Sequence, residues 1–168
     1  YKGDIVMIEN KCENRGQHCE DMRAAFEHRA TWFYTLINEA RKKGLDYDFA
    51  REAILACGRF HGDHKYTKTD DLRVFAPEFA NQNVVDIFEM EVLKADDKNL
   101  DIDFHYCPLV NAWKKLGVPE EEIATLCDIA MDGDRGIIST FPKFRFELGE
   151  TIAKGDKVCQ IRISKVGE

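Results

Sequence analysis

One short segment places a thiol where it could react. In Phe104-His105-Tyr106-Cys107-Pro108, an apolar-alternating stretch ends and a helix begins, because proline favours the first helical position. The free backbone N–H groups and the positive dipole end of a helix stabilise an anion at that point. We therefore predict a lowered pKa for the Cys107 thiol, which suits a nucleophile or a metal ligand.

His105 precedes this thiol by two residues, so the two side chains share a face if the strand continues through both. It would then deprotonate Cys107 or activate a water molecule. The alternative is a metal such as zinc held by His105 and Cys107, with Cys127, Cys159 or His61 completing the site. No CxxC motif is present and no spacing demands a metal. We therefore expect no cofactor. A purely structural role for Cys107, as a buried side chain of the core, remains an alternative.

The composition predicts an ordinary soluble protein with a core of its own. Its 168 residues suffice for one domain, and its net charge of −7 argues against a nucleic-acid surface. No apolar run reaches membrane-spanning length, and no signal-peptide pattern opens the chain. Six scattered cysteines predict free thiols in the cytoplasm, although Cys12 and Cys19 share a polar loop in which they could pair. We expect a small-molecule substrate and no nucleic-acid or membrane partner, and leave a homo-oligomer open.

Helical periodicity dominates the first half of the chain. Apolar residues recur every three or four positions over 20–43, and Gly44 predicts the end of that helix. A second helix is expected from Asp46 or Asp48 to about residue 59, closed by the glycines of 58–62, and a short one over 70–80. Residues 4–9 predict a short strand or a helix end, which would make 1–18 a peripheral strand and loop.

Alternating apolar residues predict two hairpins in the second half. The first pairs 84–93 with 100–106 and the second pairs 144–148 with 157–163. Two helices, 108–116 and 119–131, lie between them, and 132–136 predicts a turn. We therefore expect one α+β domain, 1–168, with N-terminal helices and an antiparallel sheet of about four strands built from hairpins over about 84–106 and 143–164. Cys57, Cys127 and Cys159 lie on apolar faces and are expected in the core.

Several segments between residue 20 and the C-terminus carry a family pattern. They are Glu27-His28-Arg29-Ala30, Gly58-Arg59-Phe60-His61-Gly62, Phe104-His105-Tyr106-Cys107-Pro108-Leu109, Leu126-Cys127-Asp128-Ile129-Ala130-Met131, Gly133-Asp134-Arg135-Gly136 and Gly155-Asp156-Lys157-Val158-Cys159. With these segments the chain resembles the L-2-amino-thiazoline-4-carboxylic acid hydrolase family. Its ending is also similar to small-molecule-binding domains of the 4-vinyl reductase type, which implies a non-catalytic binding module as the alternative.

The hydrolase resemblance implies opening of a five-membered cyclic isothiourea. A nucleophile adds to the amidine-like carbon, and the ring opens by expelling thiolate or amine. Cys107 would attack and His105 would serve as base, while Asp134 would bind a protonated amidine or orient His105. Turn chemistry explains the Asp134 segment equally well. Arg29 or Arg59 would bind the substrate carboxylate, and His61 would face the same pocket.

Overall fold

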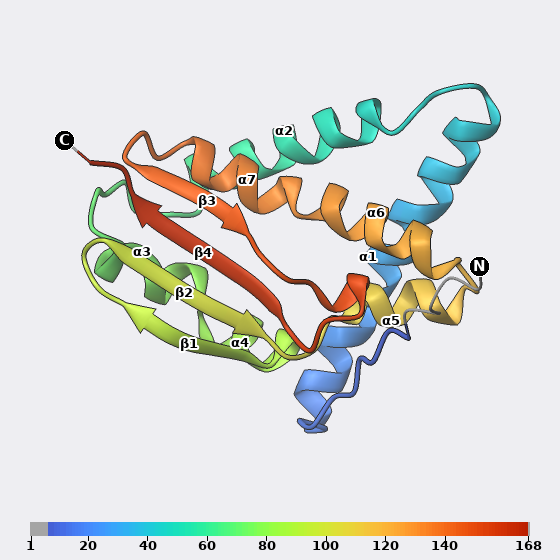
Figure 1. Cartoon of the computed structure of the whole chain (residues 1–168), viewed down its shortest axis with the longest axis horizontal. Coiled ribbons are helices and arrows are strands. Elements are labelled where there is room, and N and C mark those ends of the chain that lie inside the picture. The colour runs from blue at the N-terminus through green and yellow to red at the C-terminus, as the bar shows by residue number, and fades with distance from the viewer. Residues whose placement is uncertain (1–6, 168) are drawn as a thin grey trace, which may run out of the picture.

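The computed structural model describes residues 7–167 (Figure 1). Half of the element predicted over 4–9 therefore lies outside the described residues, and residues 7–9 form neither helix nor strand. Within the described range, no helix combines the length and the hydropathy that crossing a bilayer requires. All six thiols are free, so Cys12 and Cys19 do not pair.

The two long helices of the first half are α1, Gln17–Lys42, and α2, Asp48–His64. Gly44 follows α1 at φ +87°, a conformation that glycine adopts without strain. The predicted end of α2 is wrong, since the helix continues through Gly58 and Gly62. Both glycines are buried against α7 (Asp132–Ser139), so close helix packing rather than chain termination explains them.

Two short helices precede the sheet. In α3, Leu72–Phe79, the Asp71 carboxylate caps the first turn by accepting the N–H of Arg73. The strand predicted from residue 84 is wrong over its first half, because Asn81 caps another helix, α4, Gln82–Phe88. Val84 and Phe88 fit the predicted alternation, but together with Ile87 they also fit a helical spacing. Glu89, at φ +49°, ends α4 and leads into the first strand.

The four strands form one antiparallel sheet in the order β1-β2-β4-β3. They are β1, Met90–Ala95; β2, Asn99–Phe104; β3, Phe144–Leu148; and β4, Cys159–Lys165. The two predicted hairpins are confirmed, and β2 joins them by pairing with β4, where Ile102 lies opposite Ile161. Alternate residues of β2 and β4 are buried, so one face of the sheet supports the core.

Three α-helices, rather than two, separate the hairpins. The predicted α5, Pro108–Lys115, and α6, Glu120–Ala130, are present, and α7 occupies the segment predicted as a turn. Met131 keeps a helical backbone, so α7 follows α6 directly. A 3-10 turn, η1 (Ile152–Lys154), connects β3 to β4. The helices lie along one side of the sheet in Figure 1, and the chain is α+β.

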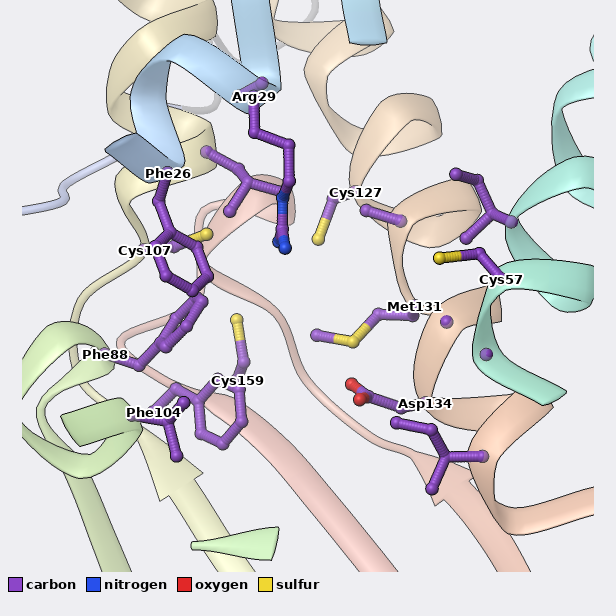
Figure 2. A pocket seen from close by; sticks show the side chains of 18 of the residues that line it. Phe26, Arg29, Cys57, Phe88, Phe104, Cys107, Cys127, Met131, Asp134 and Cys159 are labelled. Atoms are coloured by element: carbon purple, nitrogen blue, oxygen red, sulfur yellow. The ribbon is translucent and has the colours of Figure 1, made fainter. Parts of the chain in front are cut away.

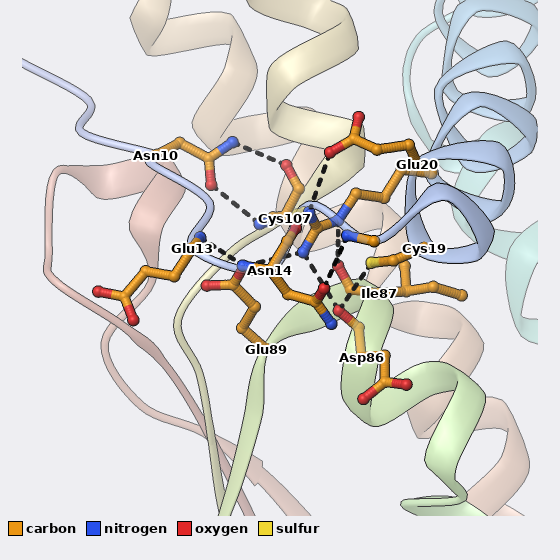
Figure 3. A network of polar contacts seen from close by, with 11 residues as sticks. Asn10, Glu13, Asn14, Cys19, Glu20, Asp86, Ile87, Glu89 and Cys107 are labelled. Atoms are coloured by element: carbon orange, nitrogen blue, oxygen red, sulfur yellow. Dashed lines mark hydrogen bonds and ion pairs between the residues drawn. The ribbon is translucent and has the colours of Figure 1, made fainter.

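A buried arginine joins α1 to the junction of α4 and β1. Arg23 is only 2% exposed and donates to the carbonyl oxygens of Ile87 (3.0 Å) and Asp86 (3.1 Å). Its guanidinium also pairs with the Glu89 carboxylate at 2.9 Å. Figure 3 shows Asp86, Ile87 and Glu89 gathered in this polar network. Charge-assisted hydrogen bonds to two carbonyls and a carboxylate satisfy this otherwise costly buried cation.

Candidate functional site

A cavity of about 350 Å³ lies between the helices and the buried face of the sheet (Figure 2). Helices α1, α2, α5, α6 and α7 contribute to its walls together with strands β2 and β4. Most of the lining is aromatic or aliphatic, including Phe26, Phe33, Phe88, Phe104, Trp113 and Met131. Such a lining gives a low-dielectric interior in which each charged group has a large effect.

Two opposite charges from different walls project into this predominantly apolar space, which Lys65 also lines. Arg29 enters from α1 and Asp134 enters from α7, on a different wall (Figure 2). The Arg29 guanidinium also lies 4.5 Å from the ring centroid of Phe26. Asp134 is partly accessible because it faces the cavity, although protein surrounds it on its other sides. A carboxylate and a guanidinium at separate walls can hold the two ends of one polar ligand.

Burial shifts the pKa values of both groups. It raises the pKa of Asp134 to about 6, and the positive charges of Arg29 and Arg135 only partly oppose this effect. Burial likewise lowers the pKa of Arg29, while Cys57, Asp134 and Cys107 act in the opposite direction. Asp134 therefore changes its protonation state close to neutral pH, which is the range that acid–base catalysis needs.

A four-residue ion-pair network positions the helix that carries Asp134. Arg51 of α2 contacts Asp128 at 2.7 Å and Asp132 at 3.1 Å. Arg135 contacts the same two carboxylates at 2.8 Å and 2.6 Å. Because Asp132 is buried and both arginines are only about one-third exposed, this network is better shielded than an ordinary surface pair. It ties α2, α6 and α7 together on the outer side of the cavity wall.

Four of the six cysteines line the cavity, namely Cys57, Cys107, Cys127 and Cys159. The thiols of Cys107, Cys127 and Cys159 point toward the same space that the Arg29 guanidinium enters (Figure 2). Cys127 and Cys159 are buried as expected, whereas the prediction of a buried Cys57 is wrong because that residue is exposed at the cavity wall.

Cys107 occupies the predicted position before Pro108, but its pKa is not lowered. The backbone N–H groups of Leu109 and Val110 at the start of α5, together with the charge of Arg29, act to lower the pKa of the Cys107 thiol. Burial, followed by the charge of Cys159, raises its pKa to about 12. The predicted lowering is therefore wrong, because desolvation of a fully buried thiolate outweighs the favourable helix end. The backbone N–H of Cys107 donates instead to the Asn10 side chain at 2.9 Å, as Figure 3 shows.

His105 does not lie beside Cys107. Strand β2 ends at Phe104, so the alternation that would place both side chains on one face does not continue. His105 is exposed, its Nε2 lies 3.0 Å from the Glu91 carboxylate, and it lines a separate surface depression. The alternative metal pair of His105 and Cys107 is therefore not assembled. Within residues 7–167, no three His, Cys, Asp or Glu side chains converge in a metal-binding arrangement.

Of the two arginines predicted to bind the carboxylate, only Arg29 lines the cavity, and the predicted His61 lines it as well. Arg59 is exposed on α2 and does not line the cavity. His61 lines it from the same helix, with its ring 5.5 Å from that of Phe60. Of the six predicted site residues, the cavity thus brings together Arg29, His61, Cys107 and Asp134 and leaves out Arg59 and His105.

Three further residues of the cavity were not among the proposed catalytic or substrate-binding residues, and two of them, Cys127 and Cys159, entered only as alternative metal ligands. Cys127 and Cys159 were assigned to the core, although each lies in a segment that carries the family pattern. Tyr66, directly after α2, also lines the cavity, and burial raises its pKa to about 12. For Cys127 and Cys159, their position within segments of the family pattern was the available signal of a site residue. No local pattern distinguishes Tyr66.

Comparison with known proteins supports both the fold and the family. A crystal structure of a trafficking protein particle complex subunit 3 from Naegleria fowleri, covalently bound to palmitic acid, is similar with a TM-score of 0.55. The alignment covers 84% of this chain and 95% of that chain at 16% identity, which establishes a shared fold alone. Comparison with curated proteins found no match.

A family model gives the more specific result. The model described as L-2-amino-thiazoline-4-carboxylic acid hydrolase matches residues 23–163. This match spans α1 to β4 and so includes the helices and strands that form the cavity walls. The chain therefore belongs to the L-2-amino-thiazoline-4-carboxylic acid hydrolase family.

Proposed function

We propose that this cavity hydrolyses a small cyclic amidine or isothiourea that carries a carboxylate, of the 2-amino-thiazoline-4-carboxylate type. The single observation that carries the proposal is the pair of opposite charges, Arg29 and Asp134, that enters a predominantly apolar cavity from two walls. A ligand with an anionic group and a cationic amidine matches this arrangement, and the family membership agrees with it.

Arg29 binds the carboxylate end of the substrate. A guanidinium forms two parallel hydrogen bonds with a carboxylate, which fixes orientation as well as affinity. The aromatic ring of Phe26 lies under the guanidinium and limits its freedom. The substrate carboxylate would also pair with a guanidinium whose pKa the surrounding protein lowers.

Asp134 binds the amidine end. As a carboxylate it accepts hydrogen bonds from a protonated amidine and favours that protonated form, whose central carbon is more electrophilic than that of the neutral amidine. With a pKa of about 6, it also exchanges a proton readily near neutral pH. Addition at this carbon gives a tetrahedral centre, and collapse of that centre opens the ring.

The test is direct turnover of defined substrates. The full chain is incubated with 2-amino-thiazoline-4-carboxylate and with the same ring lacking the carboxylate, and ring opening is followed by mass spectrometry. We expect turnover of the first compound and a large loss with the second, because only the first can engage Arg29. Absence of ring opening across carboxylate-bearing thiazolines, oxazolines and imidazolines would refute the proposed reaction.

A second candidate function is the binding of an acyl chain. The observation that favours it is the predominantly aromatic and aliphatic lining, which contains three buried thiols. The similar trafficking protein particle subunit was crystallised with covalently bound palmitic acid. Intact-mass measurement of freshly purified protein distinguishes the two functions. An added acyl mass that neutral hydroxylamine removes would support the binding function, in line with the alternative of a non-catalytic module.

A further inference from the structure

The three buried thiols of the cavity are not equivalent. Cys159 is 1% exposed, yet its Sγ accepts a hydrogen bond from the backbone N–H of Ile152 at 3.3 Å. Cys127 lines the same cavity, and its S–H is the side-chain donor available to the same sulfur. Two donors therefore converge on one sulfur atom that faces the space between Arg29 and Asp134 (Figure 2).

We propose that Cys159, rather than Cys107, is the nucleophilic thiol of this cavity and that Cys127 is the positioning residue that supports it by donating its S–H. The substrate that this nucleophile would attack rests on the proposed function. The order in which the three thiols ionise does not. A thiolate accepts hydrogen bonds far better than a thiol, so two convergent donors favour ionisation at this position.

The electrostatic effects agree with this geometry. The hydrogen bond from Cys127 lowers the pKa of Cys159, even though burial opposes it. The same hydrogen bond, together with burial, raises the pKa of Cys127. The pKa of Cys107 is also raised, first by burial and then by the charge of Cys159. Within the coupled pair of Cys127 and Cys159, the Ile152 N–H donates to Cys159, so the negative charge of the pair is better stabilised on Cys159.

The local backbone holds the donor in place. The Asp156 carboxylate accepts the N–H of Thr151 at 3.0 Å, and the Thr151 carbonyl accepts the N–H of Asp156 at 3.2 Å. Gly155, at φ +91°, completes this tight turn. The turn directs the Ile152 N–H at Cys159, which itself lies opposite Phe104 in the central strand pair. The nucleophile is therefore held by a sheet and by a fixed turn rather than by a mobile loop.

The covalent step balances without an added oxidant or reductant. The Cys159 thiolate forms a bond to the amidine carbon, and the ring carbon–sulfur bond breaks to release the substrate sulfur as a thiolate. Water then adds to the same carbon and displaces Cys159 as a thiolate. The oxygen of that water remains in the resulting urea, one of its protons goes to nitrogen, and the other goes to the released substrate thiolate.

The first test measures the ranking of thiols without turnover. Wild-type protein is treated with limiting iodoacetamide at several pH values, and each cysteine is quantified by peptide mass spectrometry. Among the three buried thiols we expect Cys159 to react first at neutral pH. In Cys127→Ala its reaction should be about tenfold slower at pH 7 and should recover at higher pH, because loss of the donor lowers the thiolate fraction. Preferential alkylation of Cys107 or Cys127 in the wild type would overturn the proposal.

The second test uses turnover and separates this inference from the proposed function. Cys159→Ala should lose ring opening by about 100-fold or more, and Cys12→Ser, a thiol outside the cavity, should retain it. Retained ring opening in Cys159→Ala would refute the nucleophile while leaving the reaction intact. Absence of turnover in the wild type, with Cys159 still alkylated first, would refute the substrate and leave the thiol ranking intact. If Cys159→Ala does not fold, the wild-type alkylation profile alone decides.

Discussion

Gly58 of α2 and Gly136 of α7 bring their two helices into backbone contact. A Cβ added to Gly58 would lie 2.8 Å from the Cα of Gly136, and one added to Gly136 would lie 2.9 Å from the Cα of Gly58. Real Cβ atoms do not approach other atoms so closely, so neither position accommodates a side chain. This crossing places Cys57 and His61 of α2 beside Asp134 of α7 along one wall of the cavity. Helix packing and site geometry are therefore set by the same contact.

This contact predicts opposite effects for two glycines of one helix. Gly136→Ala should destabilise the fold by about 1–3 kcal/mol, because the added methyl group forces α2 and α7 apart. Gly133→Ala is the matched control, since its Cβ would meet only the Ile54 side chain at 3.7 Å. It should be neutral or stabilising by up to about 1 kcal/mol through helix propensity. Urea unfolding of both variants measures the difference, and equal free energies of unfolding would contradict the packing argument.

The raised pKa of Asp134 predicts a specific dependence of stability on pH. Its pKa is about 6 in the fold and close to 3.8 when unfolded, so the folded state binds more protons between these values. Stability should therefore fall as pH rises from about 4 to about 6, and this cost persists above pH 6. Asp134→Asn should remove the fall and gain at most roughly 3 kcal/mol at pH 7. Unfolding curves between pH 4 and 8 test this.

Asp97→Asn is the control for that experiment. Asp97 is exposed in the turn between β1 and β2, so its substitution should leave the wild-type pH profile unchanged. If Asp134→Asn and the wild type have parallel profiles, the carboxyl does not carry the raised pKa.

Arg29 and Arg59 offer a second matched comparison. Both arginines are exposed residues, but Arg29 lines the cavity and Arg59 of α2 lies outside the lining. Arg29→Met should raise KM for a carboxylate-bearing substrate by about 10- to 100-fold, because a charge-assisted hydrogen bond contributes about 1.5–3 kcal/mol. Arg59→Met should leave KM close to the wild-type value. Steady-state kinetics on both variants measures this, and identical KM values would remove Arg29 from the binding site.

Hydrophobic periodicity predicted most of the fold, but only part of the site. Apolar and polar residues alternate in β1, β2, β3 and β4, which is typical of a sheet with one buried face. Both hairpins could therefore be predicted. Gly133 and Gly136 led to the prediction of a turn, because glycine is common in turns. The sequence around them does not show that a neighbouring helix packs too closely to leave room for a side chain. Whether a glycine ends a helix or packs one is decided by its tertiary contact.

The site shows the same limit at the level of single residues. Cys107 was singled out by its local position at a helix start, which predicts a lowered pKa. Its actual environment includes burial and the neighbouring Cys159, more than fifty positions away in the sequence. The placement of Cys127 near Cys159 depends on how α6 packs against η1, next to the start of β4, which no local pattern specifies. Arg29 and Asp134 were found because the family pattern marked them.

The Arg23 network predicts the largest loss of stability outside the cavity. Arg23→Met leaves the Glu89 carboxylate and the Asp86 and Ile87 carbonyls without their guanidinium donor. Removing one partner from a buried charge pair costs about 3–5 kcal/mol. The Glu89 side chain is only 13% exposed, although it also accepts the N–H groups of Glu13 and Asn14. These two bonds offset part of the loss without replacing the counter-ion.

Arg145→Met is the control, because Arg145 pairs with Glu147 on an exposed part of β3 and water solvates both charges. Its free energy of unfolding should stay close to that of the wild type. Because Glu89 also joins α4 to β1, Arg23→Met should expose that junction first, and amide hydrogen exchange would detect faster exchange at residues 86–90. Equal unfolding free energies for the two arginine variants would show that Arg23 does not hold this junction.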